Sequence, residues 1–147
     1  MPTLRSRFAA LAGIGATFFL TITGIAAAGS GAPVALPAAA LASCPANSVC
    51  LYEHKDFGGT VLVIPAGDAS PDLRAFACAS CRSSKHNNNN GTWSDQLSSW
   101  VNNTGQVYCW YWHENYAGRN DTVMNAGTAL SYVGKDPNDQ ASSIGPC

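Results

Sequence analysis

The chain has 147 residues, of which 46% are hydrophobic and 12% charged, and its formal net charge is −1. It contains no basic stripe that could hold phosphates, which excludes nucleic acid as an expected partner. Ser, His and Asp are all present, but no nucleophile elbow or zinc-protease helix motif places them together, so we do not expect an enzyme.

The N-terminal segment has the pattern of a secretory signal peptide. Arg5 and Arg7 precede an uncharged run over residues 8–28, and small-residue cleavage patterns follow at 26–28 and 40–42. We predict a signal peptide over residues 1–28, with cleavage as late as residue 42 as an alternative. The product is then secreted (extracellular), with no stable membrane insertion after cleavage. Because the apolar run is long, a retained N-terminal anchor is the rival interpretation.

Residues 29–43 are expected to be a linker or pro-segment before a single domain at 44–147. The cysteines all lie in that domain, at Cys44, Cys50, Cys78, Cys81, Cys109 and Cys147. An even number in a small exported domain indicates a disulfide framework. The sequence does not choose among the fifteen pairings; our working hypothesis joins them as Cys44–Cys50, Cys78–Cys81 and Cys109–Cys147. A redox or zinc role for the C-x-x-C at 78–81 is disfavoured, since no second such motif and no helical pattern accompanies it.

The periodicity predicts an all-β fold. Short segments that alternate or are β-branched lie between Gly, Pro, Asn and Asp clusters, at SVCLY (48–52), TVLVI (60–64), QVYCWYW (106–112), DTVMN (121–125) and ALSYV (129–133). No stretch shows sustained helical periodicity. The run at 83–93 has nothing to bury and a predicted turn at Asn90–Gly91, which places it on a mobile surface loop.

Two motifs occur twice, in the same order. CLYEHKDFGG (50–59) matches CWYWHENYAG (109–118), and DQLSSW (95–100) matches DQASSI (139–144). One unit was therefore built twice. The interval from Cys50 to Asp95 is 45 residues, whereas that from Cys109 to Asp139 is 30. We divide the domain into a first unit (44–104) with an insertion at 73–92 and a second unit (105–147).

The first motif describes a folded hairpin. Its Gly can take a backbone conformation that other residues avoid, and its two aromatics can pack on each other across the bend. The pattern of an aromatic, four residues, an aromatic, any residue and Gly resembles the Greek-key signature of the βγ-crystallin superfamily. The matching residues are Tyr52, Phe57 and Gly59 in the first copy and Tyr111, Tyr116 and Gly118 in the second. This resemblance implies a β-sandwich of two Greek-key motifs.

The second motif resembles the calcium clamp of that superfamily. NDQASS (138–143) fits at every position, whereas SDQLSS (94–99) departs at Ser94. The resemblance implies Ca²⁺ as a weakly bound cofactor, with Kd of about 10⁻⁴ to 10⁻³ M. The implied ligands are Asp95, Ser98, Asn138, Asp139 and Ser142. The alternative is that these side chains only close turns through hydrogen bonds to the backbone.

The stretches CPANSVCLYEHKDFGG (44–59) and DQLSSWVNNTG (95–105) resemble secreted bacterial metalloproteinase inhibitors with a βγ-crystallin-like fold. Members that inhibit are thought to present a substrate-like loop braced by cysteines just before the second repeat. That region, VNNTGQVYC (101–109), has no partner cysteine a few residues upstream. We therefore place the candidate inhibitory loop in the insertion, at Cys78, Ala79, Ser80, Cys81 and Arg82. A preorganised loop loses little entropy on docking; the alternative is a variable loop stapled for stability.

Other features have weaker interpretations. His54 and His113 occupy the same place in each copy, which duplication explains without a metal site. Trp110 and Trp112 alternate along one strand. We expect Trp112 to lie at the rim of the core, with its exposure to a protein partner or a sugar ring as the alternative.

The first function predicted is a secreted peptidase inhibitor, directed at a zinc metalloendopeptidase, that is a monomer. One rival is a calcium-binding structural or envelope-associated module without inhibitory action. The other is a glycan or cell-wall binder, or a toxin-like protein, that uses Trp93, Trp110 and Trp112.

Overall fold

The computed structural model describes residues 34–35, 43–120 and 123–147. The predicted signal peptide and nearly all of the predicted linker lie outside the described residues. Within the described ranges, no helix is long and apolar enough to cross a membrane.

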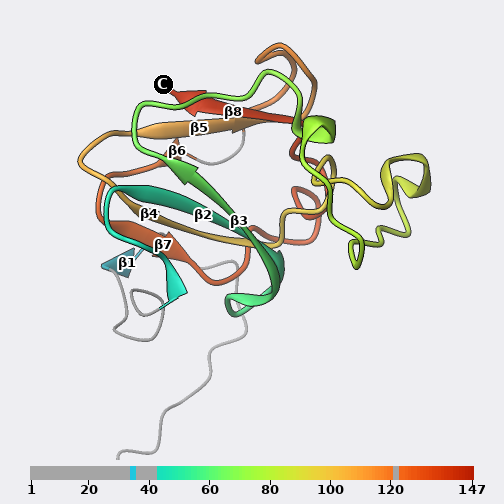
Figure 1. The fold of residues 1–147 in the computed structure, drawn as a ribbon, viewed down its shortest axis with the longest axis horizontal. Helices are drawn as coiled ribbons and strands as arrows, with labels where there is room; N and C mark the ends of the chain where they lie inside the picture. Colours follow the sequence, from blue (N-terminus) through green and yellow to red (C-terminus); the bar gives the residue numbers. More distant parts are fainter. Residues whose placement is uncertain (1–33, 36–42, 121–122) are drawn as a thin grey trace, which may run out of the picture.

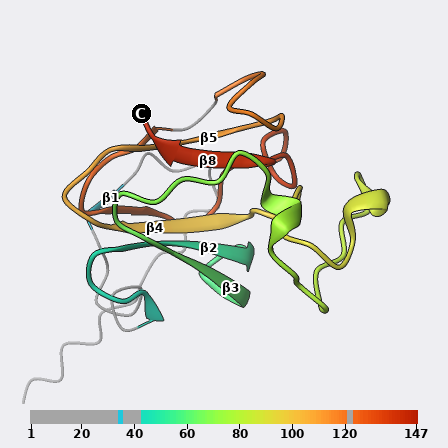
Figure 2. The same cartoon turned by 45° about the horizontal axis from the view of Figure 1, so that its top comes forward.

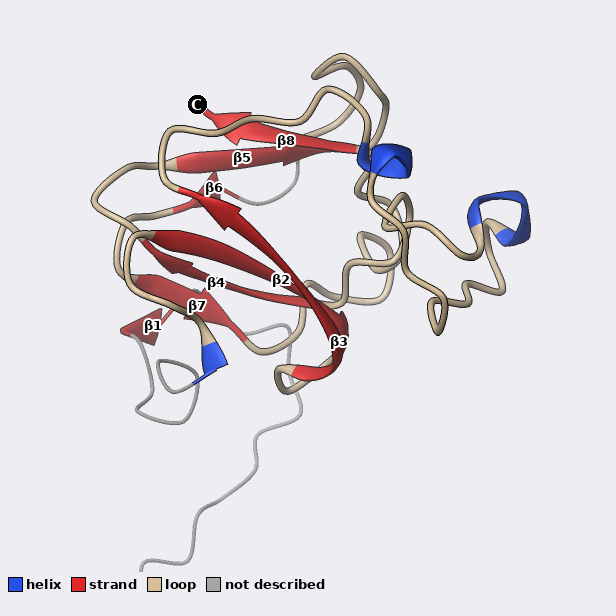
Figure 3. Cartoon of the chain, viewed as in Figure 1, coloured by secondary structure: helices blue, strands red, loops and turns tan. Residues whose placement is uncertain are grey.

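Two antiparallel sheets form the layers of the fold (Figures 1 and 2). The larger has the order β1 (Val34–Ala35), β7 (Thr128–Leu130), β4 (Ser99–Asn103), β2 (Ser48–His54) and β3 (Gly58–Pro65). The smaller has the order β6 (Val123–Met124), β5 (Tyr108–Tyr111) and β8 (Ser143–Pro146). Two short 3-10 turns, η1 (Leu73–Ala75) and η2 (Asn87–Asn89), lie in the insertion, and Ser43 is helical at the start of the domain (Figure 3). The predicted all-β fold is confirmed.

Each repeated unit contributes to both sheets. Strand β7 of the second unit pairs with β4 of the first, with Val101 opposite Ala129. Conversely, Ser70 of the first unit forms an antiparallel β-bridge with Ile144 on β8, in the smaller sheet. This exchange of a segment between Greek keys ties the two units into one sandwich, because neither sheet is built by one unit alone.

The main core lies between the sheets. Leu51, Trp100 and Trp110, from β2, β4 and β5, are fully buried there. Along β3, Leu62 and Ile64 are buried while Val61, Val63 and Pro65 face solvent, as expected for a strand with one face covered.

The described chain has the three disulfides Cys44–Cys50, Cys78–Cys81 and Cys109–Cys147. These are the three pairings of the working hypothesis. Cys44–Cys50 lies on the outer face of the larger sheet with Tyr52 and Val101. Cys109–Cys147 fastens the last residue of the chain to β5.

The strand predictions succeed where apolar residues mark the strand and fail where they do not. β2, β3, β5 and β6 lie within or across the predicted segments, whereas β7 covers only the start of ALSYV. β4 was not predicted, because its sequence SWVNN is polar. Its buried Asn102 is nevertheless satisfied, since Nδ2 donates to the carbonyls of Gln106 at 2.8 Å and Met124 at 2.7 Å.

Candidate functional site

Both copies of the first motif form the expected folded hairpin. The paired aromatics, Tyr52 with Phe57 and Tyr111 with Tyr116, meet edge to face with ring centroids 5.7 and 6.0 Å apart. Gly59 and Gly118 have φ of +76° and +81°. A Cβ on Gly118 would lie 2.6 Å from Cδ2 of His113, and one on Gly59 would lie 2.9 Å from Cδ2 of His54.

These contacts give the duplicated histidines a structural role. Each ring lies against the glycine of its own hairpin, and both side chains are otherwise exposed. Glycine is therefore required at these positions for two reasons: the left-handed backbone and the space that the imidazole occupies.

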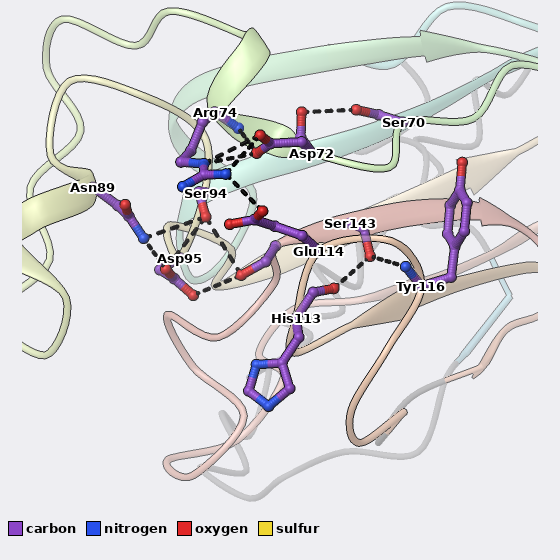
Figure 4. Close-up of polar contacts among 11 residues, drawn as sticks. Ser70, Asp72, Arg74, Asn89, Ser94, Asp95, His113, Glu114, Tyr116 and Ser143 are labelled. Atoms are coloured by element: carbon purple, nitrogen blue, oxygen red, sulfur yellow. Dashed lines mark hydrogen bonds and ion pairs between the residues drawn. The ribbon is translucent and has the colours of Figure 1, made fainter.

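The last serine of each second motif locks the hairpin of the same unit. Ser99 Oγ donates to the carbonyl of His54 at 2.6 Å and accepts from the backbone N–H of Phe57 at 3.1 Å. Ser143 makes the matching bonds, to the carbonyl of His113 at 2.7 Å and from the N–H of Tyr116 at 3.0 Å (Figure 4). Sequence reasoning recognised the repeat but not this role, and the available signal was that both motifs recur in the same order, each second motif with a serine at the same place.

The two clamp loops lie side by side. The backbone N–H of Asp95 donates to the carbonyl of Ala141 at 2.7 Å, and that of Asp139 donates to the carbonyl of Leu97 at 3.1 Å. Each clamp loop therefore places a backbone carbonyl beside the aspartate of the other loop.

The first predicted clamp, centred on Asp95, gathers side chains from both units. Ser142 Oγ donates to Asp95 Oδ1 at 3.2 Å, and Ser94 Oγ donates to Asp95 Oδ2 at 3.3 Å. Asn89 Nδ2 donates to the same carboxylate and lies 3.4 Å from Ser94 Oγ (Figure 4). Asp95 and Ser142 are 5% and 6% exposed, so a nearly buried carboxylate is held here by neutral donors.

The second predicted clamp, centred on Asn138 and Asp139, is arranged differently. Ser98 and Asn138 line one surface cavity with Lys55, but Ser98 Oγ donates to the carbonyl of Glu53 at 2.8 Å. Asp139 Oδ2 accepts from Ser83 Oγ at 3.1 Å. Burial raises the pKa of the Asp139 carboxyl, against the opposing effects of Ser83, Lys85 and His86.

The donor chemistry at both clamps fits Ca²⁺. Carboxylate, hydroxyl and backbone carbonyl oxygens are the ligands that this hard cation takes, and these are the groups that the two loops present. At the first clamp, the buried Asp95 carboxylate is bonded only to uncharged groups in the contacts described. Burying a carboxylate without a compensating positive charge is costly, so a bound cation would relieve an existing electrostatic penalty.

The predicted inhibitory loop is a disulfide-closed ring with a buried base and an exposed tip. Cys78 and Cys81 are 2% and 0% exposed, and both belong to the main core. Ala79, Ser80 and Arg82 are exposed. The ring is a closed turn, since the N–H of Cys81 donates to the carbonyl of Cys78 at 3.0 Å.

A short two-sided stem supports the ring. Cys78 N–H donates to the carbonyl of Gly91 at 2.8 Å, and Gly91 N–H donates to the carbonyl of Cys81 at 3.2 Å. On the other side, Ser80 Oγ donates to Glu53 Oε2 at 3.2 Å. Burial alone would raise the pKa of the Glu53 carboxyl, but hydrogen bonds from Thr60 and Ser80 and the adjacent His54 lower it overall.

The start of the insertion is fixed to the second unit by an exposed ion-pair cluster (Figure 4). Arg74 Nη2 lies 2.9 Å from Asp72 Oδ2 and 2.6 Å from Glu114 Oε2. Asp72 also caps η1, accepting from the N–H of Arg74 at 2.9 Å. Hydrogen bonding by the Arg74 side chain lowers the pKa of Asp72.

The prediction that residues 83–93 have nothing to bury is wrong. Ser83 is 3% exposed and Trp93 is 2% exposed. The expected turn is present: Gly91 has φ of +90° and the N–H of Thr92 donates to the carbonyl of Asn89 at 3.2 Å. The segment projects from the sandwich in Figure 1, yet its polar side chains fold back onto both clamps.

The family comparison decides what kind of protein this is. The model of peptidase inhibitor family I36 matches residues 37–123, more than half of the chain. The chain belongs to peptidase inhibitor family I36. Membership of this family implies a peptidase as the partner and indicates a non-enzymatic inhibitor. No curated protein matches the sequence.

One similar solved structure, with a TM-score above 0.5, shows that the chain has the βγ-crystallin fold. A structure described as "Evolution of the eye lens beta-gamma-crystallin domain fold" is similar with a TM-score of 0.53 at 16% identity, covering 71% of this chain and 89% of that chain. A double mutant of a βγ-crystallin domain from Clostridium beijerinckii has a TM-score of 0.47 at 22% identity, covering 67% and 93%. A βγ-crystallin from an archaeon has a TM-score of 0.46 at 22% identity, covering 70% and 100%.

The tryptophans of the inhibitor are mostly internal. Trp93 and Trp110 are 2% and 0% exposed. Trp112 is half-buried against the main core, with the Arg119 guanidinium 5.3 Å from its ring centroid. The rim position expected for Trp112 is correct, whereas Trp110 lies inside the core.

Proposed function

We propose that this protein is a secreted inhibitor of a zinc metalloendopeptidase and that the ring Cys78–Cys81, with Arg82, is its protease-contacting loop. The observation that supports this choice is the combination of an exposed tip with a base that is part of the core. Secretion is supported by the three disulfides, which persist in oxidising compartments. The choice of a zinc enzyme rests on the resemblance to bacterial metalloproteinase inhibitors.

An inhibitory loop that stays bound after cleavage has to be held in one conformation before it binds, and the ring is held in this way. The Cys78–Cys81 bond, the stem with Gly91 and the bond from Ser80 to Glu53 hold it before it binds. Docking then orders few additional side chains, which favours affinity. The residues that a protease could contact here are Ala79 and Ser80 at the tip of the ring and Arg82 directly after it, since these are exposed.

Ca²⁺ is proposed as a weakly bound stabiliser of this scaffold. Asp95 and Ser142 would hold it at the first clamp, and Ser98, Asn138 and Asp139 at the second. When bound, the cation would neutralise carboxylates that the fold partly buries and would tie the loops of the two units together.

Replacing one of two exposed alanines by aspartate tests whether the ring contacts the protease or whether any added surface charge weakens inhibition. Ala79→Asp adds a charge at the exposed tip of the ring, and Ala126→Asp adds the same charge at an exposed turn between β6 and β7, away from the insertion in Figure 1. We expect Ala79→Asp to weaken inhibition of a thermolysin-like protease more than about 10-fold, as disruption of a central contact does. Ala126→Asp should inhibit like the wild type. Equal inhibition by both variants would place the contact elsewhere on the molecule.

A calcium-binding structural module without inhibitory activity remains the second candidate, and the buried Asp95 carboxylate with neutral partners favours it. Folded protein that binds calcium and inhibits no protease would support this alternative. The glycan-binding alternative loses two of its three proposed aromatics, because Trp93 and Trp110 are buried; pull-down on insoluble polysaccharide tests the remaining one.

A further inference from the structure

The insertion reaches the predicted calcium clamps with side chains of its own. Ser83 donates to the carboxylate of Asp139, and Asn89 donates to that of Asp95. The second unit has no counterpart of this segment, since its own interval between the motifs is shorter. The contacts are therefore a feature of the insertion and not of the duplicated scaffold.

Lys85 makes the most informative of these contacts. Its ammonium donates to the carbonyls of Lys135 at 2.9 Å, Asp136 at 3.4 Å and Asn138 at 2.9 Å. An ammonium has three donors, and all three are directed at one turn of the chain. This turn leads directly into Asp139, so the positive charge lies beside the second predicted clamp.

The groups that Lys85 and Ser83 bind are of the kind that a calcium ion binds. Backbone carbonyls and a carboxylate are hard oxygen donors. A lysine ammonium and a hydroxyl satisfy them with one unit of charge and directed hydrogen bonds. A divalent cation at the same oxygens would repel the ammonium and would compete with Ser83 for Asp139.

We propose that the insertion is a built-in occupant of the second clamp: Lys85 and Ser83 hold the oxygens of residues 135–139, so that docking of the insertion and binding of Ca²⁺ at this clamp exclude each other. This inference rests on the calcium binding proposed above and adds its regulation. Calcium then loosens the segment that follows the ring, whereas in its absence the segment is held against the sandwich.

The first test is calcium titration calorimetry on three forms of the oxidised protein. Lys85→Met removes the charge and the three hydrogen bonds with little change in side-chain length. Lys55→Met is the matched control, because Lys55 lines the cavity beside Asn138 but donates no hydrogen bond to residues 135–138 in the contacts described. We expect Lys85→Met to bind calcium at least about fivefold more tightly than wild type, the lower range of a typical coupling between two sites. Lys55→Met should change the affinity by less than half of that factor.

Hydrogen–deuterium exchange supplies a second readout that involves no protease. Calcium should increase exchange over residues 82–92 in the wild type. In Lys85→Met, exchange over these residues should be high without calcium and should not change when calcium is added. Equal calcium affinities for wild type and Lys85→Met, equal gains in both lysine variants, or unchanged exchange in wild type that has bound calcium would each overturn the proposal. If neither wild type nor Lys85→Met binds calcium, the proposed clamp and this inference both fail. The inhibitor function is then still decided separately, by protease titration.

Discussion

Replacing Gly118 by alanine tests whether the repeated motif is built on glycine for both of the reasons given above. At φ of +81° an alanine occupies the left-handed region, which costs about 1–2 kcal/mol for an L-residue. The added Cβ would also lie 2.6 Å from Cδ2 of His113, far inside the ordinary contact distance of about 3.5–4.0 Å between carbon atoms. Overpacking of this kind costs about 1–3 kcal/mol more.

Gly127 is the matched control. Its φ is also positive, at +66°, but a Cβ added there meets nothing within 4 Å. Urea unfolding of both alanine variants should therefore give a loss of about 1–2 kcal/mol for Gly127→Ala and about 2–5 kcal/mol for Gly118→Ala. The difference should vanish when Gly118→Ala is made in a His113→Ala background. Equal losses for the two glycines in the wild-type background would refute the claim that the imidazole occupies this space.

Three further results are expected. Removing the disulfide Cys109–Cys147 by paired serine substitution should destabilise the protein by about 1.6 kcal/mol more than removing Cys44–Cys50, because the closed loops span 38 and 6 residues; urea unfolding measures both, and the reverse order would contradict the loop-entropy argument. Burial raises the pKa of Asp139 above its ordinary value of 3.8, so its contribution to stability is present below about pH 4 and is lost as the pH rises through the raised value. In calcium-free buffer, Asp139→Asn should match wild type at pH 3 and be at least as stable at pH 7; a large loss at pH 7 would show that the charge itself is needed. Glu53 has a lowered pKa, so its contribution is present above its ordinary value of 4.5 and is lost as the pH falls through the lowered value. Ser80→Ala should raise that pKa in an NMR titration, and an unchanged value would mean that the bond from the ring is absent in solution.

The parts of the fold that local sequence encodes were predictable. The hairpins follow from aromatic and glycine positions a few residues apart, and β2, β3 and β5 follow from alternation of apolar residues. β4 escaped prediction because Ser99 and Asn102 are polar. They are buried there only because the carbonyls of His54, Gln106 and Met124 accept their hydrogen bonds, and two of these three residues are more than 20 positions away.

The environment of the clamps could not be predicted, for a related reason. The motifs indicated Asp95 and Asp139, but nothing local indicated that Asn89 or Ser83 would reach them. Lys85 bonds to carbonyls 50 or more residues further along the chain. Such contacts depend on how the insertion folds back over the sandwich, and a run of Ser and Asn carries no periodicity that would show it.

The most direct test of the inhibitor assignment is a titration of a thermolysin-like protease and a serine protease with refolded, oxidised protein spanning residues 43–147, with and without calcium. We predict stoichiometric loss of the metalloprotease activity and no loss of the serine protease activity. Full activity of both enzymes in the presence of excess folded protein would contradict the assignment and leave the calcium-binding structural module as the better account.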